Sequence, residues 1–159
     1  MTAALRPSAE IVAALDLAPH TEGGFYRETY RSPVQVMTSR GPRALSTSIL
    51  YLVDDAHPSR FHRLVHDEMW YFHDGWPLEM IFLEDGAREP RRVMLDKERP
   101  QVLAPGGVWM AARVRSERDW TLAGCVVTPG FEYDDFERAR PEALMRQFPA
   151  AAEVIAALG

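Results

Sequence analysis

The 159-residue sequence contains only one cysteine, Cys125, which excludes a disulfide within the chain. Structural disulfides are common in secreted proteins and rare in the cytosol, so this scarcity indicates a reducing, cytoplasmic environment. Cys125 lies in the apolar run 122–127, where a thiol packs as a small hydrophobic group. We therefore expect a buried, inert thiol at this position and not a nucleophile.

Clusters of positive charge and long apolar stretches are also missing. The net charge is −5, and the densest basic stretch, residues 88–92, is interrupted by Glu89 and Pro90, unlike the basic surface of a nucleic-acid-binding protein. No apolar run approaches the ~18–20 residues of a membrane span, and residues 1–7 lack the pattern of a signal peptide. We expect neither nucleic acid nor membrane as a partner, but a small molecule or another protein.

Internal repeats, low-complexity segments and linkers are absent too, so residues 1–159 are predicted to form one domain. The hydrophobic content of 47% and the charged content of 26% are those of an ordinary globular protein. A chain of this length buries roughly 70% of the surface of its unfolded form, which suffices for a hydrophobic core.

Helices are expected only at the two ends of the chain. Ser8 is placed to cap a short N-terminal helix that ends by Pro19. Pro141 is placed to open a C-terminal helix, and Pro149 to begin a further helical turn, because proline suits the first helical position.

The middle of the chain predicts strands. Eight short runs are rich in β-branched and aromatic residues and are separated by Gly, Pro and Asp; they are residues 25–31, 45–53, 59–65, 68–72, 78–83, 91–95, 108–114 and 120–128. About eight short strands without helices between them indicate an all-β jelly-roll barrel or sandwich. Alternation in the run 68–72 places Glu68, Trp70 and Phe72 on one face, which predicts a pocket wall or a core that contains one charge.

Candidate chemistry concentrates in the histidines. His57, His62, His66 and His73 lie within 17 residues, together with Glu68. These residue types suit a metal site, although the spacing of His62 and His66 joins two imidazoles only on a helix. On strands, we expect His62 and Glu68 to face each other across a hairpin, with His66 at the turn. His62 is then either a pocket residue or a hydrogen-bonded structural histidine, and the other histidines belong to loops or the surface.

This stretch resembles the first motif of the cupin superfamily, which consists of His-x-His, three or four residues, Glu, six residues and Gly. His62, Glu68 and Gly75 keep their places, and Leu64 replaces the second histidine. In the second cupin motif, Met110 replaces a histidine.

A closer resemblance is to the cupin-5 family, which comprises single-domain cupins similar to deoxysugar epimerases. It covers about residues 8–148, and its characteristic stretches are Glu22-Gly-Gly-Phe-Tyr-Arg-Glu-Thr-Tyr-Arg, Ser59-Arg-Phe-His-Arg, Asp67-Glu-Met-Trp-Tyr-Phe, Pro105-Gly-Gly-Val-Trp and Gly124-Cys-Val-Val-Thr-Pro-Gly-Phe. Family members usually carry Gln at the position of Met110. The resemblance implies a jelly-roll fold, a small-molecule ligand, and metal-free chemistry by a histidine base and a tyrosine acid.

A metal cofactor is not expected. A catalytic zinc or iron takes about three protein ligands; His62 and Glu68 supply two, whereas Leu64 and Met110 supply no oxygen or nitrogen. If a divalent transition metal did bind, His66 is the candidate third ligand. Without a metal, Glu68 is predicted to orient His62 as a general base, since a carboxylate partner fixes a histidine's tautomer and favours its charged form.

Further cavity residues follow from strand alternation. Tyr26 and Tyr133 are candidate acids, with a half-buried tyrosine whose hydroxyl reaches water as the alternative. Arg27 and Thr29 share one face of the first strand and are candidate ligand contacts, Arg27 either for a phosphate or carboxylate or in a structural ion pair. The remaining predicted ligand-binding residues are Ser46, Ser48, His62, Glu68, Trp70 and Met110.

Three functions stay open. The first is a metal-independent isomerase or epimerase of a sugar-like or nucleotide-sugar-like substrate with His62 as base; the others are a non-catalytic small-molecule binder and a metal-dependent enzyme with a reduced ligand set. The fold alone does not choose among them. Strand 25–31 is an exposed edge unless it is paired, so we also expect a homodimer through the N-terminal strands.

Overall fold

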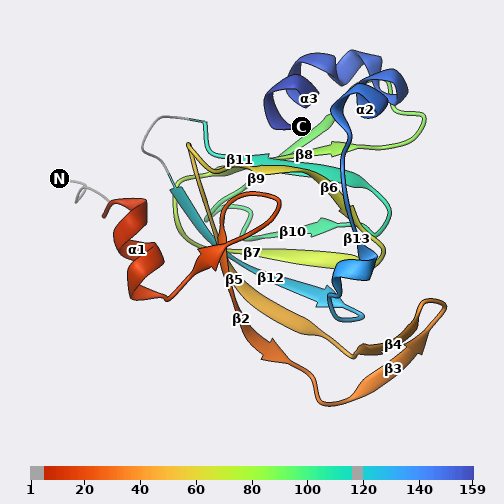
Figure 1. Ribbon diagram of the computed structural model, residues 1–159. Coiled ribbons are helices and arrows are strands. Elements are labelled where there is room, and N and C mark those ends of the chain that lie inside the picture. Colours follow the sequence, from red (N-terminus) through yellow and green to blue (C-terminus); the bar gives the residue numbers. More distant parts are fainter. Residues whose placement is uncertain (1–5, 116–119) are drawn as a thin grey trace.

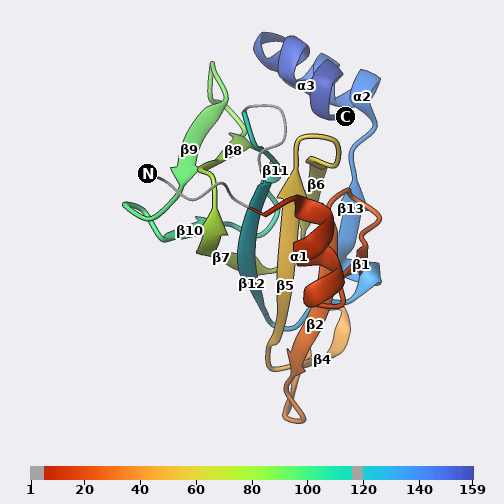
Figure 2. The same ribbon diagram turned by 90° about the vertical axis from the view of Figure 1, so that its left-hand side faces the viewer.

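Two antiparallel β-sheets face each other and enclose the core in the computed structural model, which describes residues 6–115 and 120–159 (Figures 1 and 2). The first sheet has the order β1 (Ala18–Pro19), β2 (Phe25–Arg31), β5 (Thr47–Asp54), β12 (Trp120–Thr128), β7 (Asp67–Gly75) and β10 (Gln101–Ala104). The second has the order β13 (Phe136–Arg138), β6 (Ser59–Leu64), β11 (Trp109–Arg113), β8 (Leu78–Leu83) and β9 (Arg91–Leu95). A separate hairpin, β3 (Gln35–Thr38) and β4 (Gly41–Ala44), projects away from both sheets. Strands distant in sequence are neighbours in space, and the predicted all-β jelly roll is confirmed.

The helices lie outside the barrel, near its two chain ends. They are α1 (Ser8–Ala14), η1 (Tyr133–Asp135), α2 (Pro141–Gln147), η2 (Pro149–Ala151) and α3 (Ala152–Leu158). α1 packs on the outer face of the six-stranded sheet, where Ile11 contacts Leu52 and Trp120. α2 and α3 cover the outer face of the five-stranded sheet. None of the described helices has the length and apolar character needed to cross a membrane.

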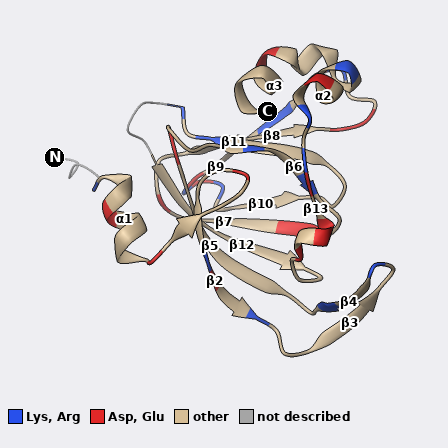
Figure 3. Cartoon of the chain, viewed as in Figure 1, with Lys and Arg blue, Asp and Glu red and all other residues tan. Residues whose placement is uncertain are grey.

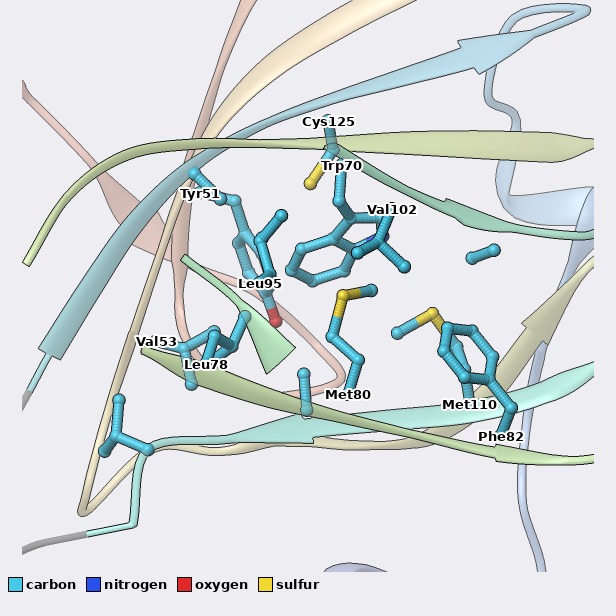
Figure 4. Packing of buried hydrophobic residues seen from close by; sticks show 14 residues of the cluster. Tyr51, Val53, Trp70, Leu78, Met80, Phe82, Leu95, Val102, Met110 and Cys125 are labelled. Carbon is cyan, nitrogen blue, oxygen red and sulfur yellow. The ribbon is translucent and has the colours of Figure 1, made fainter. Parts of the chain in front are cut away.

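Strand β8 shows how the sequence builds both layers of the core. All six of its residues are buried, because Met80 and Phe82 point into the barrel while Ile81 and Leu83 point toward α2 and α3. Successive side chains of a strand alternate between faces, so an uninterrupted apolar run requires cover on both sides. Figure 4 shows the inner layer, in which Met80 points toward Trp70 and Phe82 lies beside Met110. Each such side chain contributes about 1.5–3 kcal/mol by leaving water.

Some local predictions are confirmed and others are wrong. The strands at 25–31, 78–83, 91–95 and 120–128 have the predicted bounds, and Pro141 opens α2. Ser8 does not cap α1, because it is the first helical residue and Pro7 occupies the cap position without a side-chain hydrogen bond. Pro19 lies in β1 and does not end the helix, which stops at Ala14. The short strands β1, β3, β4, β10 and β13 were not predicted, since two to four residues carry no periodic signal.

Candidate functional site

A cavity of about 120 Å³ lies inside the barrel, several times the roughly 10–15 Å³ that one water molecule requires. Its lining is rich in ionisable side chains. The lining residues are His20, Glu22, Tyr26, Glu28, Arg31, Thr47, Ile49, Tyr51, His62, Leu64, Glu68, Cys125, Val127, Phe131, Glu132 and Tyr133. The structure therefore brings His62 and Glu68 to one cavity, where the sequence also expected them, and places beside them Tyr26, for which the sequence left two alternatives open.

His62, on β6, has protein partners on both ring nitrogens. Its Nδ1 lies 2.8 Å from the carbonyl oxygen of Arg60, which only accepts hydrogen bonds, so Nδ1 carries a hydrogen. Its Nε2 lies 3.2 Å from Oε2 of Glu22. If neither atom carried a proton, the lone pairs of Nε2 and Oε2 would repel each other at this distance. The imidazole and the carboxylate therefore share one proton. The ring is 1% exposed and stacks on Phe136, which fixes its plane.

Glu22 is the partner of His62, and the prediction that Glu68 orients this histidine is wrong. The two strands that carry His62 and Glu68 do not form a hairpin pair: β6 belongs to the five-stranded sheet and β7 to the six-stranded sheet. The two side chains therefore face each other across the cavity. Glu22 comes from the turn between β1 and β2, where its Oε1 accepts a hydrogen bond from Ser59 Oγ at 3.1 Å.

Two glycines bring Glu22 to this place. Gly23 and Gly24 have φ of 112° and 68°, in the region that favours glycine. A Cβ on Gly23 would lie 1.9 Å from the carbonyl oxygen of Pro58, so only glycine lets this turn approach β6. The hydroxyl of Tyr51 donates a hydrogen bond to the Gly23 carbonyl oxygen at 2.7 Å, which holds the turn in place.

Glu68 is buried and forms no salt bridge with any residue in the described part of the chain. Its Oε2 accepts a hydrogen bond from Trp70 Nε1 at 2.8 Å. Burial, followed by the nearby charge of Glu22, raises the pKa of Glu68 to about 7, against the opposing influence of His62 and the Trp70 hydrogen bond. This carboxyl group therefore exchanges its proton near neutral pH.

His20 is a cavity residue that sequence reasoning missed. Its Nδ1 accepts a hydrogen bond from the backbone N–H of Glu22 at 3.2 Å, so Nε2 carries the hydrogen of the neutral ring. Burial lowers the pKa of His20, with Glu22 opposing and His62 adding to this effect, so the ring is uncharged at neutral pH. His20 and Glu22 precede the first long strand, and their clustering just before Gly23 was the available signal.

Four predicted ligand contacts lie on the wrong face. Arg27 donates from Nε to the Leu15 carbonyl at 2.8 Å, and Thr29 donates to the Ser48 carbonyl; both side chains are exposed, outside the cavity lining. Ser46 and Ser48 are likewise outside it. The opposite face of each strand points inward, and its cavity-lining residues are Tyr26, Glu28, Thr47, Ile49 and Tyr51.

Trp70, Met110 and His66 occupy three different settings. Trp70 is fully buried in the core and acts on the cavity only by holding Glu68. Met110 is also buried and lines a small void beside His62 and Glu68 (Figure 4 shows its place in the core). His66 lies outside the cavity lining, with Nε2 3.5 Å from an oxygen of Asp135.

The residues at the expected ligand positions do not fit a catalytic metal. Leu64 and Met110 adjoin His62 and Glu68, so two of four positions offer no oxygen or nitrogen donor. His66, the candidate third ligand, lies outside this group of residues and faces Asp135. Across residues 6–115 and 120–159, no group of three or more His, Cys, Asp and Glu side chains is arranged to hold a metal ion.

Cys125 is buried, as predicted, although its residue also adjoins the cavity. Burial, then the charges of Glu68 and Glu22, raises the pKa of its thiol well above the ordinary value. The thiolate is the nucleophilic form of cysteine, so this environment favours an inert thiol.

Known proteins share this fold and sequence pattern. The family model described as Cupin superfamily (DUF985) matches residues 9–139. A hypothetical protein from Leishmania major has a TM-score of 0.88 and 31% identity, over 97% of this chain and 99% of its own. Protein SO0799 from Shewanella oneidensis has a TM-score of 0.84 and 36% identity, over 98% of each chain. Oxalate decarboxylase from Bacillus subtilis, for which Mn(II) centres are described, shares the fold at 15% identity and a TM-score of 0.58, over 91% of this chain and 37% of that one.

Proposed function

Because the chain belongs to the DUF985 family of the cupin superfamily, we propose that it is a metal-independent isomerase or epimerase of a sugar-like substrate. Such an enzyme moves a proton on a small polar carbonyl compound. The observation that carries the proposal is the contact of 3.2 Å between Glu22 Oε2 and His62 Nε2 at the cavity wall. A buried carboxylate that shares a proton with an imidazole is a ready proton-transfer group.

Glu22 is the proton acceptor in this proposal, and His62 is a positioning residue. With the shared proton on Nε2 of His62, the Glu22 carboxylate takes the proton from the carbon beside the substrate carbonyl, and the electron pair of that C–H bond moves into the carbonyl to form an enolate. His62 cannot turn toward the substrate, because Arg60 holds its Nδ1. It keeps Glu22 in place through the shared proton. A proton delivered to the opposite face of the same carbon completes epimerisation. A proton delivered to the adjacent carbon completes isomerisation, while the hydroxyl proton passes to the former carbonyl oxygen.

Tyr26 is the candidate donor to the developing enolate oxygen. Its ring lines the cavity and lies 4.7 Å from that of His20, centroid to centroid. A hydroxyl that hydrogen-bonds a developing oxyanion stabilises the transition state more than the ground state. Tyr133 also lines the cavity, where burial, followed by its neighbour Tyr26, raises the pKa of its hydroxyl.

A metal-dependent reaction of the kind the Mn(II) centres of oxalate decarboxylase suggest is not supported by the ligand set of this chain. Such a centre takes about three protein donors and an open position. Here Leu64 and Met110 replace two of them.

Exchange of solvent deuterium into candidate sugars tests the proposal. Wild-type protein incubated in D₂O with D-glucose, D-fructose and D-glucosamine should catalyse exchange at the carbon beside the carbonyl, measured by NMR. Glu22→Gln should lower the rate by at least about 100-fold, the usual worth of a general base, because the amide is isosteric but accepts no proton. Glu137→Gln, at the exposed ion pair with Arg63, is the matched control and should keep the wild-type rate.

Two results would contradict the proposal. Full exchange activity in Glu22→Gln would remove the proposed base. Binding of a sugar without any exchange by the wild type would identify a non-catalytic binder instead.

A further inference from the structure

The ionisable groups of the cavity are predominantly acidic. Four glutamates line it, and Arg31 is the one Lys or Arg side chain among the described lining residues. This arginine is fully engaged: its Nε and Nη2 donate to Glu28 at 3.0 and 2.9 Å, and its Nη1 donates to Glu132 at 2.9 Å. Acidic residues also gather at η1, which follows Glu132 directly (Figure 3), but Asp135 there is neutralised by ion pairs with Arg40 and Arg43. A phosphate or carboxylate on a ligand would therefore meet repulsion, without a free guanidinium to pair with.

Glu68 offers an unused acceptor at the cavity wall. Its side chain is 93% buried, since the residue is only 7% exposed. Oε2 accepts from Trp70, while Oε1 has no hydrogen-bond partner among the described residues. Glu22 differs, because Ser59 and His62 occupy its two oxygens. Oε1 is not one of the fully buried polar atoms without a partner, and Glu68 lines the cavity, so this oxygen is reached from the cavity and is open to a donor from a ligand.

Aromatic rings surround the same space. Tyr26, Tyr51, Phe131 and Tyr133 line the cavity, and their centroids lie 4.7 to 6.4 Å from that of His20. The faces of aromatic rings attract cations, and such rings form the usual cages for ammonium groups. These aromatic rings and the carboxylate of Glu68 together favour a positively charged ligand over a neutral or negatively charged one.

We infer that the substrate of this cavity carries a protonated primary or secondary amine, whose N–H donates to Oε1 of Glu68 while the surrounding rings contact the charge. The substrate class is a small amino sugar and not a nucleotide-sugar, and amino alcohols serve as probes of the amine site alone. This inference rests on the proposed function in one respect, that the same cavity binds the substrate. It assigns Glu68 to recognition and leaves proton transfer to Glu22.

Binding measurements on matched pairs of small molecules test it. The probes are ethanolamine and ethylene glycol, serinol and glycerol, and glucosamine and glucose, each pair differing by an amine in place of a hydroxyl. Titrations by calorimetry at about pH 7.5, where most of Glu68 is ionised and simple alkyl amines are protonated, should give at least about tenfold tighter binding for the amine of one or more pairs. Glucose 6-phosphate should bind more weakly than glucose.

The variant Glu68→Gln should reduce the preference for the amine to within about twofold, while Glu98→Gln, on an exposed turn, should keep it. Equal affinity within every pair, failure of all three amines to bind, or a preference that survives in Glu68→Gln overturns the inference. These outcomes are separate from those for the proposed function. Glu22→Gln should retain amine binding while it loses deuterium exchange. If the wild type instead exchanges deuterium into neutral sugars and shows no preference for amines, Glu22 keeps its proposed role and only the role of Glu68 is removed.

Discussion

At the scale of single residues, the protonation of Glu68 links the cavity to the stability of the fold. Its raised pKa of about 7, against an ordinary 4.5, means that the folded protein binds this proton more tightly than the unfolded chain. The contribution of the group is therefore fully present below about pH 4.5 and is lost as the pH rises through 7. With about 1.4 kcal/mol for each pKa unit, the loss amounts to about 3 kcal/mol.

The variant Glu68→Gln should remove this pH dependence. Its amide oxygen still accepts from Trp70, but it never carries a charge. Urea unfolding at about pH 5 should give similar free energies for both proteins, and at about pH 8 the variant should be the more stable by about 1–3 kcal/mol. The exposed Glu98→Gln is the control. A variant that is equally or less stable than wild type at pH 8 would contradict the assignment.

Also at this scale, Leu64 and Met110 decide the metal affinity of the barrel. Both adjoin His62 and Glu68, so Leu64→His with Met110→His adds two imidazoles to the existing imidazole and carboxylate. Elemental analysis after dialysis against zinc should find well under one equivalent in wild type and close to one in the double variant. The single variant Leu64→His should fall between them. A stoichiometric metal in wild-type protein would refute the metal-independent proposal.

At the scale of elements, the turn between β1 and β2 positions the chemistry. Gly23→Ala places a methyl group against the Pro58 carbonyl at a φ of +112°, whereas Gly86→Ala at +80° meets no atom within 4 Å. The second substitution incurs only the strain of a positive φ, about 1 kcal/mol. The first should lower the free energy of unfolding by at least about 2 kcal/mol more, and it should abolish deuterium exchange by displacing Glu22.

Denaturant unfolding and the exchange assay check both effects, with Gly86→Ala as the matched control. Equal losses of stability in the two variants would show that the approach of the turn to β6 is not required. Exchange activity in a folded Gly23→Ala protein would separate this turn from the proposed site.

At the scale of the whole molecule, the open edge of β2 supports the proposed homodimer. β1 pairs only with Phe25 and Tyr26, so the rest of β2 has a free edge on that side among the described strands. Large apolar side chains are exposed nearby, with Tyr30 at 52% and Met37 at 79%. Unpaired strand edges and exposed apolar groups favour association.

Sedimentation equilibrium at micromolar concentration should give twice the chain mass of 18.0 kDa. Tyr30→Lys with Met37→Lys should yield monomer, because two charges would be buried at the interface. Leu103→Lys, on the opposite edge strand β10, is exposed to a similar degree as Tyr30 and should leave the dimer intact. A wild-type mass of one chain would contradict the dimer.

The sequence by itself determined the jelly roll and most of its long strands, because alternation and turn-forming residues are local properties. It also placed His62 and Glu68 at one cavity through the resemblance of their motif. The tertiary structure alone decided which face of each strand points inward. In β5, both faces are buried, Tyr51 against the core and Leu52 against α1, so alternation defined two faces without choosing between them.

The hydrogen-bond partner of His62 also depends on the tertiary structure. Glu22 lies 40 residues earlier in the chain, and it reaches the imidazole only because β6 and the turn before β2 meet across the barrel. The neighbour in sequence, Glu68, enters the opposite sheet and takes Trp70 as its partner. Local sequence fixes the direction of a side chain relative to its own strand, but a hydrogen bond between two sheets depends on how the sheets pack, which the whole chain decides.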